Sequence, residues 1–171
     1  MSETKSLYHE DFVLWSKQQA AALRAAARAG TNQPIDWENV AEEIEDLGKT
    51  DRRTLHSQVR RIVLHLIKLE HSPAIGPRRG WRESIRDART QIEDLLDDSP
   101  SLRRETLEII RREIERGARL ALADLADRGE LDGSLAEALR AESYLELFAY
   151  TEEQVLGDWF PPEPQEAPRG E

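Results

Sequence analysis

Cysteine is missing from this chain of 171 residues. Its absence excludes disulfides, thiolate zinc sites, iron–sulfur clusters and cysteine nucleophiles, and it fits a reducing compartment. Long apolar runs are missing as well. Residues 1–10 are polar, and no segment approaches the ~20 apolar residues of a membrane-spanning helix. We therefore expect a soluble cytoplasmic protein without membrane contact.

The chain also has fewer basic residues than acidic ones. The chain has 24 Lys and Arg residues against 34 Asp and Glu residues, a formal net charge of −10. Half of this deficit lies in residues 151–171, which carry 6 acids and 1 base. The stretch from Lys49 to Arg89 is basic, with 11 bases and 4 acids. Because the whole chain repels polyanions, we expect nucleic-acid contact only locally, through this stretch.

What the sequence does have is apolar residues at a period near 3.6, without a strand-like alternation. This pattern predicts helices over about residues 9–29, 37–47, 55–69, 81–96 and 100–129. Gly30 is placed to end the first helix, and Gly48 to break or kink the run that follows. Ser99 and Pro100 are expected to open the fifth helix, as N-cap and first helical residue, and Leu107 to lie in its buried face.

Short helices are expected near the C-terminus, because two residue pairs have the spacing of a capping box. These pairs are Ser134 with Glu137 and Thr151 with Gln154. Residues 163–171 are rich in Pro and Glu, which predicts a disordered tail. Long amphipathic helices with short connections must pair their apolar stripes. We therefore expect an all-α fold, a single antiparallel up-down four-helix bundle over residues 1–162 with additional short C-terminal helices.

Histidine spacing offers no ready metal site. The four histidines are His9, His56, His65 and His71, and no two of them are three or four residues apart. We therefore expect no metal and no cofactor. His65 lies at the boundary of its helix's apolar stripe. It is either a half-buried packed histidine or a ligand or general base that faces Glu42, Glu43 or Glu45.

Arginines of the basic stretch form a candidate strip for anion contact. The six members are Arg53, Arg60, Arg78, Arg79, Arg82 and Arg86. The alternative interpretation is that they form ion pairs with the abundant acidic residues. The loop at residues 76–80 lacks the spacing and the Lys-Ser/Thr of a phosphate-binding P-loop, and no nucleophile elbow or kinase signature is present.

Several blocks of the sequence resemble a known bacterial family. The blocks are Tyr8-x-x-Asp11-Phe12-x-x-Trp15, Asp36-Trp37-x-Asn39-Val40-x-Glu42-Glu43-Ile44-Glu45-x-Leu47-Gly48, Leu64-His65-Leu66-x-Lys68, Trp81 with Ile85, Arg89 and Ile92, Ser99-Pro100-Ser101-Leu102, and Tyr150-Thr151-x-x-Gln154-Val155-Leu156-x-Asp158-Trp159-Phe160-Pro161. Over residues 6–162 they resemble the "domain of unknown function 29" family. The resemblance implies a helical bundle and supplies no activity and no catalytic residue. Asp36, Asn39, Glu43 and His65 lie within its blocks and form a candidate polar site.

Three hypotheses of function follow. The leading one is a non-enzymatic module that binds another protein or itself as a homo-oligomer, since no catalytic constellation is evident and Leu64 and Ile67 extend the apolar surface of their helix. The second is a small regulatory or antitoxin-like module with a local nucleic-acid contact through the Lys49–Arg89 stretch. The third is a metal-dependent hydrolase centred on His65 and neighbouring carboxylates.

Overall fold

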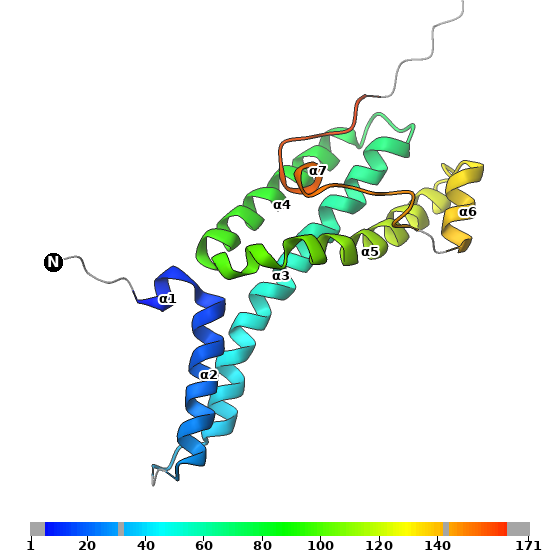
Figure 1. Cartoon of the computed structure of the whole chain (residues 1–171). Helices are drawn as coiled ribbons and strands as arrows, with labels where there is room; N and C mark the ends of the chain where they lie inside the picture. The colour runs from blue at the N-terminus through cyan, green and yellow to red at the C-terminus, as the bar shows by residue number, and fades with distance from the viewer. Residues whose placement is uncertain (1–5, 31–32, 142–143, 164–171) are drawn as a thin grey trace, which may run out of the picture. The chain divides into compact units, whose positions relative to one another are not determined.

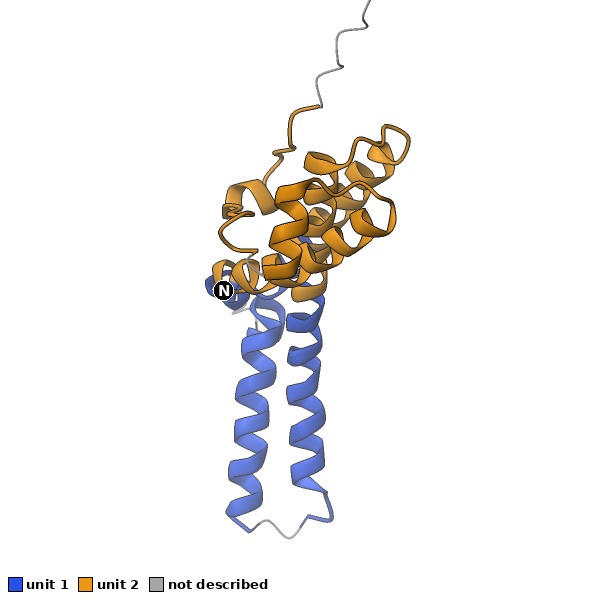
Figure 2. Ribbon diagram, turned by 90° about the vertical axis from the view of Figure 1, so that its right-hand side faces the viewer, with its two compact units in different colours: residues 1–55, 93–105 blue, residues 56–92, 106–171 orange. Residues whose placement is uncertain are grey.

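The structure is a computed structural model that describes residues 6–30, 33–141 and 144–163 (Figure 1). Within these ranges every regular element is a helix, which confirms the all-α class. None of the helices described there is long and apolar enough to cross a membrane. The chain divides into two compact units, residues 1–55 with 93–105 and residues 56–92 with 106–171 (Figure 2). The single up-down four-helix bundle over residues 1–162 therefore stays a prediction.

Unit 1 is built on a helical hairpin. It contains α1 (Leu7–Glu10), α2 (Phe12–Arg28), residues 37–55 of α3 (Trp37–His71), residues 93–98 of α4 (Arg78–Asp98) and the 3-10 helix η1 (Pro100–Arg104). In both views α2 and the first half of α3 lie side by side and run in opposite directions (Figures 1 and 2).

Asp11 divides the helix that the sequence predicts over residues 9–29. Its carboxylate accepts the backbone N–H of Leu14 at 2.9 Å and so caps the start of α2. The same buried carboxylate accepts the backbone N–H of Ser101 at 2.7 Å and the Ser101 hydroxyl at 2.9 Å. Asp11 therefore begins α2 and fixes η1 against it.

The two glycines of the hairpin have different roles. Gly30 has a φ of 77° and follows the end of α2, as predicted. Gly48 does not break the next run, because α3 is one helix of 35 residues. A methyl group at Gly48 would collide with Ser16 Oγ of α2. The expectation of a break is wrong because this glycine permits a close approach of two helices.

Unit 2 holds most of the apolar core. It contains the rest of α3 and α4 together with α5 (Thr106–Asp127), α6 (Gly133–Ala141) and α7 (Glu152–Leu156). The largest fully buried apolar side chains of the unit are Ile62, Leu66, Ile67, Leu69, Ile85, Ile110, Leu122, Leu125 and Leu135. Ile67 is thus packed inside the unit and Leu64 is half-buried. Ile67 is therefore not the open contact surface on which the self-association hypothesis relied.

The start of α5 differs from the expectation. Residues 100–104 form the 3-10 helix η1, and α5 begins at Thr106. Ser99 makes no side-chain cap, because its hydroxyl oxygen accepts the backbone N–H of Val13 at 3.2 Å instead. The apolar stripe of α5 keeps its phase, since Ile110 and Ile114 are buried. The expectation for Leu107 is wrong: in the first turn of α5 it is 48% exposed.

One of the two predicted capping boxes is present. Thr151 Oγ1 accepts the backbone N–H of Gln154 at 3.2 Å, and Gln154 Oε1 accepts the backbone N–H of Thr151 at 2.9 Å, which caps α7. The box of Ser134 with Glu137 is wrong. Asp132 caps α6 instead, since its Oδ1 accepts a backbone N–H of the first turn at 2.9 Å and the Ser134 hydroxyl at 2.8 Å. An Asp placed before the helix competes successfully with Ser for this role.

The predicted tail is described only at its first residue. The carboxylate of Glu163 forms ion pairs with Arg78 and Arg82 of α4. Residues 164–171 of the predicted disordered tail lie outside the described residues. The disorder of that segment stays a prediction.

A glycine also sets the distance between α3 and α5. A Cβ at the buried Gly117 of α5 would lie 2.9 Å from Cγ1 of Val63 and 3.2 Å from the carbonyl oxygen of Arg60. Neither neighbour is the mobile end of a long side chain. The backbones of α3 and α5 can therefore come this close only because residue 117 has no side chain.

The substitution Gly117→Ala tests this contact. The methyl group must push α3 and α5 apart, so we expect a net loss of about 1–3 kcal/mol in the free energy of unfolding, although Ala favours helix by about 1 kcal/mol. The matched control is Gly80→Ala in α4, where a methyl group meets no atom within 4 Å. Urea unfolding followed by circular dichroism should show a small gain for the control. A gain for both variants contradicts the close approach.

Candidate functional site

The unit 1 residues of the candidate polar site belong to the start of α3. The Asp36 carboxylate accepts the backbone N–H of Asn39 at 3.3 Å and its Nδ2 at 2.6 Å. Asp36 therefore caps the start of α3. Glu43 lies one turn after Asn39, and all three side chains are exposed. These residues form a polar edge of α3, which we call the acidic rim (Asp36, Asn39, Glu43).

His65, the fourth residue of the candidate polar site, belongs to unit 2. It is half-buried, and its buried Nδ1 has no hydrogen-bond partner. The pKa of His65 is lowered to about 4, chiefly by burial and in addition by the positive charges of Lys68 and Arg61, while Asp124 acts in the opposite direction. His65 is therefore neutral at pH 7. The carboxylate that acts on it is Asp124 of α5, where the sequence suggested Glu42, Glu43 or Glu45.

The surroundings of His65 do not favour a divalent cation. The Lys68 ammonium is buried and pairs with Asp124 at 2.7 Å, and Arg128 pairs with the same carboxylate at 3.1 Å. The one acidic neighbour is thus already neutralised by two cations. No group of three or more His, Asp or Glu residues that could hold a metal occurs in the described part of the chain. The hydrolase hypothesis gains no observation in its favour.

The candidate arginine strip separates into different environments. Arg53 is exposed in unit 1, and Arg60 is bound to Glu113 in unit 2. Arg79 is exposed and pairs with Glu83 at 2.8 Å along α4. The other three, Arg78, Arg82 and Arg86, contact the C-terminal segment of the chain. The structure therefore brings together only this last group of the six.

The polar side chains that do converge surround Glu113 of α5. Its carboxylate is fully buried and accepts three hydrogen bonds, from His56 Nδ1 at 2.8 Å, Arg60 Nε at 2.6 Å and Arg116 Nη1 at 3.1 Å. Burial acts to raise the pKa of Glu113, but the hydrogen bonds from Arg60 and His56 outweigh it, and the pKa is lowered overall. The carboxylate is therefore charged and held by three donors at pH 7.

The Glu113 cluster orients a histidine without completing a catalytic site. A carboxylate on Nδ1 fixes the tautomer of an imidazole, as it does in hydrolytic triads. His56 is 19% exposed on its side chain, so part of the ring meets solvent. Within the described residues, however, no hydroxyl forms a hydrogen bond with the other ring nitrogen of His56. The geometry fits a structural network that joins α3 to α5.

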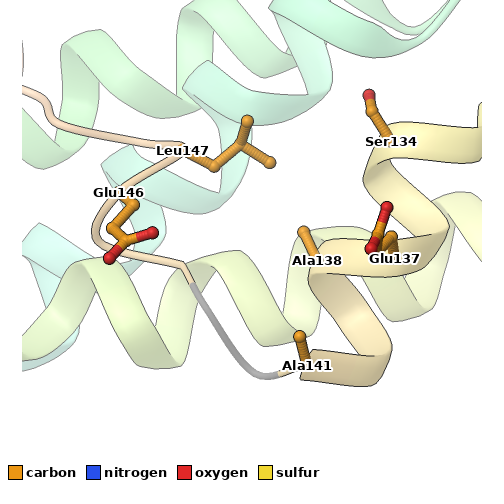
Figure 3. Close-up of a pocket in the computed structure, with 6 residues that line it drawn as sticks. All are labelled: Ser134, Glu137, Ala138, Ala141, Glu146 and Leu147. Carbon is orange, nitrogen blue, oxygen red and sulfur yellow. The ribbon is translucent and has the colours of Figure 1, made fainter.

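An open pocket of about 380 Å³ lies beside α6 in unit 2 (Figure 3). Its lining residues are Ser134, Glu137, Ala138, Ala141, Glu146 and Leu147. Figure 3 shows α6 on one side of the pocket and the segment with Glu146 and Leu147 on the other. Among the described residues, the lining combines two carboxylates, the Ser134 hydroxyl and apolar groups. The Ser134 hydroxyl donates to the capping carboxylate of Asp132 at 2.8 Å and so serves the start of α6.

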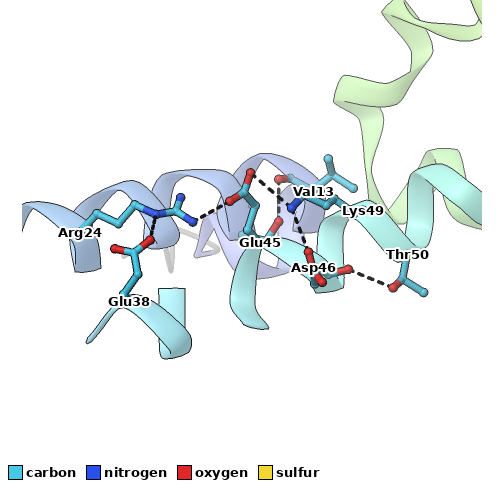
Figure 4. A network of polar contacts seen from close by, with 8 residues as sticks. Val13, Arg24, Glu38, Glu45, Asp46, Lys49 and Thr50 are labelled. Carbon is cyan, nitrogen blue, oxygen red and sulfur yellow. Dashed lines mark hydrogen bonds and ion pairs between the residues drawn. The ribbon is translucent and has the colours of Figure 1, made fainter. Parts of the chain in front are cut away.

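In unit 1, ion pairs close one side of the hairpin (Figure 4). Arg24 of α2 binds Glu38 at 3.0 Å and Glu45 at 2.9 Å, both on α3. Lys49 binds Asp46 at 2.9 Å and lies 3.8 Å from Glu45. A smaller pocket of about 210 Å³ is lined by residues of this side, among them Glu45 and Lys49. Of its charged groups, Glu45 and Lys49 lie 3.8 Å apart, and Arg52 forms an ion pair with Glu105.

The geometry thus gives a helical protein with polar networks and no catalytic constellation among the described residues. The family model described as "Domain of unknown function DUF29" matches residues 7–160 of the chain.

The chain belongs to the DUF29 family. It is also similar to a solved structure, the crystal structure of an alpha-helical protein of unknown function from Rhodospirillum rubrum. The two sequences are 30% identical, the match covers 74% of this chain and 80% of that chain, and the TM-score is 0.60. No curated protein matched the chain. The comparisons confirm the family resemblance and supply no activity for this DUF29 chain.

Sequence reasoning missed three polar residues that the structure makes central. Glu113 follows Ile110 by three residues and precedes Gly117 by four, so it lies on the apolar stripe of its helix. A charged residue on a buried stripe was the available signal. Asp124 and Arg89 gave no such signal, because their partners are distant in the sequence.

The pH dependence of stability tests the environment of His65. The unfolded residue binds a proton below pH ~6.5, whereas the folded one binds it only near pH 4. Acid therefore favours the unfolded state of this DUF29 chain. The free energy of unfolding should fall between pH 6.5 and 4, with a His65 contribution of about 3 kcal/mol. In the variant His65→Gln, the free energy of unfolding should fall less over this pH range. His9→Gln, at an exposed position, should keep the wild-type slope, and equal slopes in all three proteins contradict the assignment.

Removing the charge of Glu113 tests the buried network. Glu113→Gln should cost about 1–3 kcal/mol at pH 7, because two arginines lose their anion but can still reach water. The pKa of Glu113 is lowered in the folded state. Its contribution is therefore present above pH ~4.3 and disappears as the pH falls through the lower folded value. Wild type should lose more stability than Glu113→Gln in this acid range. Glu83→Gln, an exposed ion pair on α4, should behave like wild type throughout.

Proposed function

We propose that this DUF29 chain is a non-enzymatic module that associates with a second copy of itself through the hairpin of unit 1. The observation that supports this proposal is the half-covered apolar stripe of α3. Ala41 and Gly48 are buried against α2, whereas Val40 and Leu47 on the same stripe are 39% and 50% exposed. At 100° per residue, α2 covers only one edge of this stripe.

The matching side of α2 is uncharged and mostly apolar, and Tyr8 of α1 packs against the aromatic residues at its start. Helical geometry places Phe12, Trp15, Gln19, Ala22, Leu23 and Ala26 on one side of α2. In an antiparallel hairpin this side and the exposed edge of the α3 stripe face the same direction. Together they form one surface, which we call the open face.

On the other side of the hairpin, the polar groups are engaged in ion pairs. Arg24, Glu38 and Glu45 link α2 to α3 there, and Lys49 extends the network (Figure 4). A two-helix layer buries an apolar face only against a second layer. The closed side offers polar groups already paired with each other. The open face is therefore the side that requires a covering layer.

A second copy fits this requirement by its charge pattern. The acidic rim borders the open face along α3, whereas the open side of α2 has no charged residue. If two hairpins pack face to face about a two-fold axis with α3 against α2 of the partner, each acidic rim meets an uncharged edge. Like charges do not oppose each other, and the four helices enclose a shared core.

Sedimentation equilibrium tests the proposal. Wild type should show a reversible dimer, and Leu47→Lys should shift it to monomer because a charge enters the shared core. The matched control is Leu107→Lys, which changes a leucine of similar exposure in unit 2. A wild type that stays monomeric at about 1 mM contradicts the proposal, since association is then weaker than about 4 kcal/mol. Equal dissociation of both variants contradicts it as well.

A further inference from the structure

The C-terminal segment of unit 2 lies against an arginine face of α4. Arg89 donates to three backbone carbonyls of the segment, from Nε to Val155 at 2.9 Å and from Nη2 to Gln154 at 2.9 Å and Trp159 at 2.8 Å. These bonds fix the backbone of residues 154–159. They position the next residue, Phe160, over the helix.

Three guanidinium groups surround the ring of Phe160. The Cζ atoms of Arg82, Arg86 and Arg89 lie 5.5, 5.3 and 4.9 Å from the centre of the ring. An aromatic face attracts one cation, but it does not remove the repulsion among three. We call this group the Phe160 arginine cluster (Arg82, Arg86, Arg89).

The cluster has little negative charge within ion-pair distance. Glu163 binds Arg82, and it also binds Arg78 at 3.0 Å. Within the described residues no carboxylate forms an ion pair with Arg86 or Arg89. Asp158 and Glu153 act on Arg89 only through longer-range attraction, and burial lowers its pKa. In a chain of net charge −10, this local excess of positive charge needs an explanation.

Two donors of the cluster are also unsatisfied. Arg82 Nε and Arg89 Nη1 are buried atoms without a hydrogen-bond partner. A buried N–H without an acceptor is costly, and native structures contain few of them. An anion beside the ring would accept from such donors and reduce the repulsion of the three cations.

We propose that the Phe160 arginine cluster binds the phosphate group of a ligand. A phosphate monoester carries about −1.5 to −2 charges at pH 7 and offers three acceptor oxygens, so it matches several forked guanidinium donors better than a single carboxylate does. The site lies in unit 2 and is independent of the hairpin proposed for self-association.

Glu163 acts as an internal competitor for this site. Its side chain is 59% exposed, so water already screens its ion pairs. Arg78 stays anchored without it, because Arg78 also donates to the carbonyls of Leu69 at 2.8 Å and Ser72 at 3.3 Å. A dianion can therefore displace the Glu163 carboxylate without dismantling the surrounding structure.

NMR of the arginine Nε–H groups tests the proposal in the full-length wild type. Inorganic phosphate is titrated at constant ionic strength, with chloride as the balancing anion. The signals of Arg82 and Arg86 should shift saturably, and the signal of Arg79 should not. A 5′-phosphorylated dinucleotide forms a second arm, which distinguishes free phosphate from a phosphate carried on a nucleotide. Saturable shifts with either probe support the proposal.

Variants sharpen the assignment. Arg86→Gln should weaken phosphate binding about tenfold, as expected for the loss of a charged hydrogen-bond donor. Arg79→Gln removes the same charge from an exposed position of the same helix and should leave the affinity unchanged. Glu163→Gln should strengthen binding several-fold, which a purely structural role of the cluster does not predict.

Three outcomes would overturn the proposal. The first is a linear, non-saturating shift of all arginine signals, and the second is an equal loss of affinity in Arg79→Gln and Arg86→Gln. The third is weaker binding in Glu163→Gln. If Arg86→Gln does not fold, as judged by its thermal unfolding, the wild-type titration decides alone.

Discussion

The close approach of α3 and α5 at Gly117 is the constraint on which unit 2 depends. Glu113 lies one turn before Gly117. On α3, Arg60 lies about one turn and His56 two turns before Val63, the residue that Gly117 contacts. Hydrogen bonds of 2.6 and 2.8 Å to Glu113 exist only at this helix separation. A buried carboxylate without these donors would carry a large desolvation cost. The glycine and the charged network therefore require each other.

The two units use charge in different ways. In unit 2 the Glu113 carboxylate is fully buried and its donors are partly exposed, so the network fixes the register of α3 against α5. In unit 1 the ion pairs of Arg24 and Lys49 lie in solvent and contribute little to stability. The large, fully buried apolar side chains of the hairpin unit are correspondingly few, Leu55 and Leu102. This contrast is why we propose that a second copy covers the open face of the hairpin.

Local signals in the sequence predicted what local interactions decide. The helical class, the end of α2 at Gly30 and the capping box of Thr151 all depend on residues within four positions of each other. The role of Gly48 could not be predicted in this way, because a glycine that breaks a helix and a glycine that permits close packing of two helices look the same in the local sequence. Only Ser16, 32 positions earlier, distinguishes them. Leu107 was misplaced for a related reason: it has the phase of the buried Ile110 and Ile114, and periodicity does not show which residues of a stripe other segments cover.

The candidate sites depend on contacts between segments that are far apart in the sequence. The arginine strip was proposed from neighbours in the sequence, yet the partners of Arg82 and Arg86 are Phe160 and Glu163, more than seventy positions away. Asp124 is likewise far from His65 in the sequence and was not considered. Glu113 was missed as well, although a charged residue on an apolar stripe is a signal that the sequence itself contains. Site prediction from one sequence is thus limited by contacts between distant segments.

The preference for arginine over lysine follows from what these side chains bind. The chain has 20 Arg and 4 Lys. Arg52 holds both oxygens of Glu105 at 2.8 and 2.7 Å, Arg89 holds three carbonyls and Arg78 holds two. An ammonium group is a compact charge without a planar fork and cannot reproduce the bidentate arrangement. Each of these three guanidinium groups therefore joins its own helix to another segment of the chain through two or more hydrogen bonds.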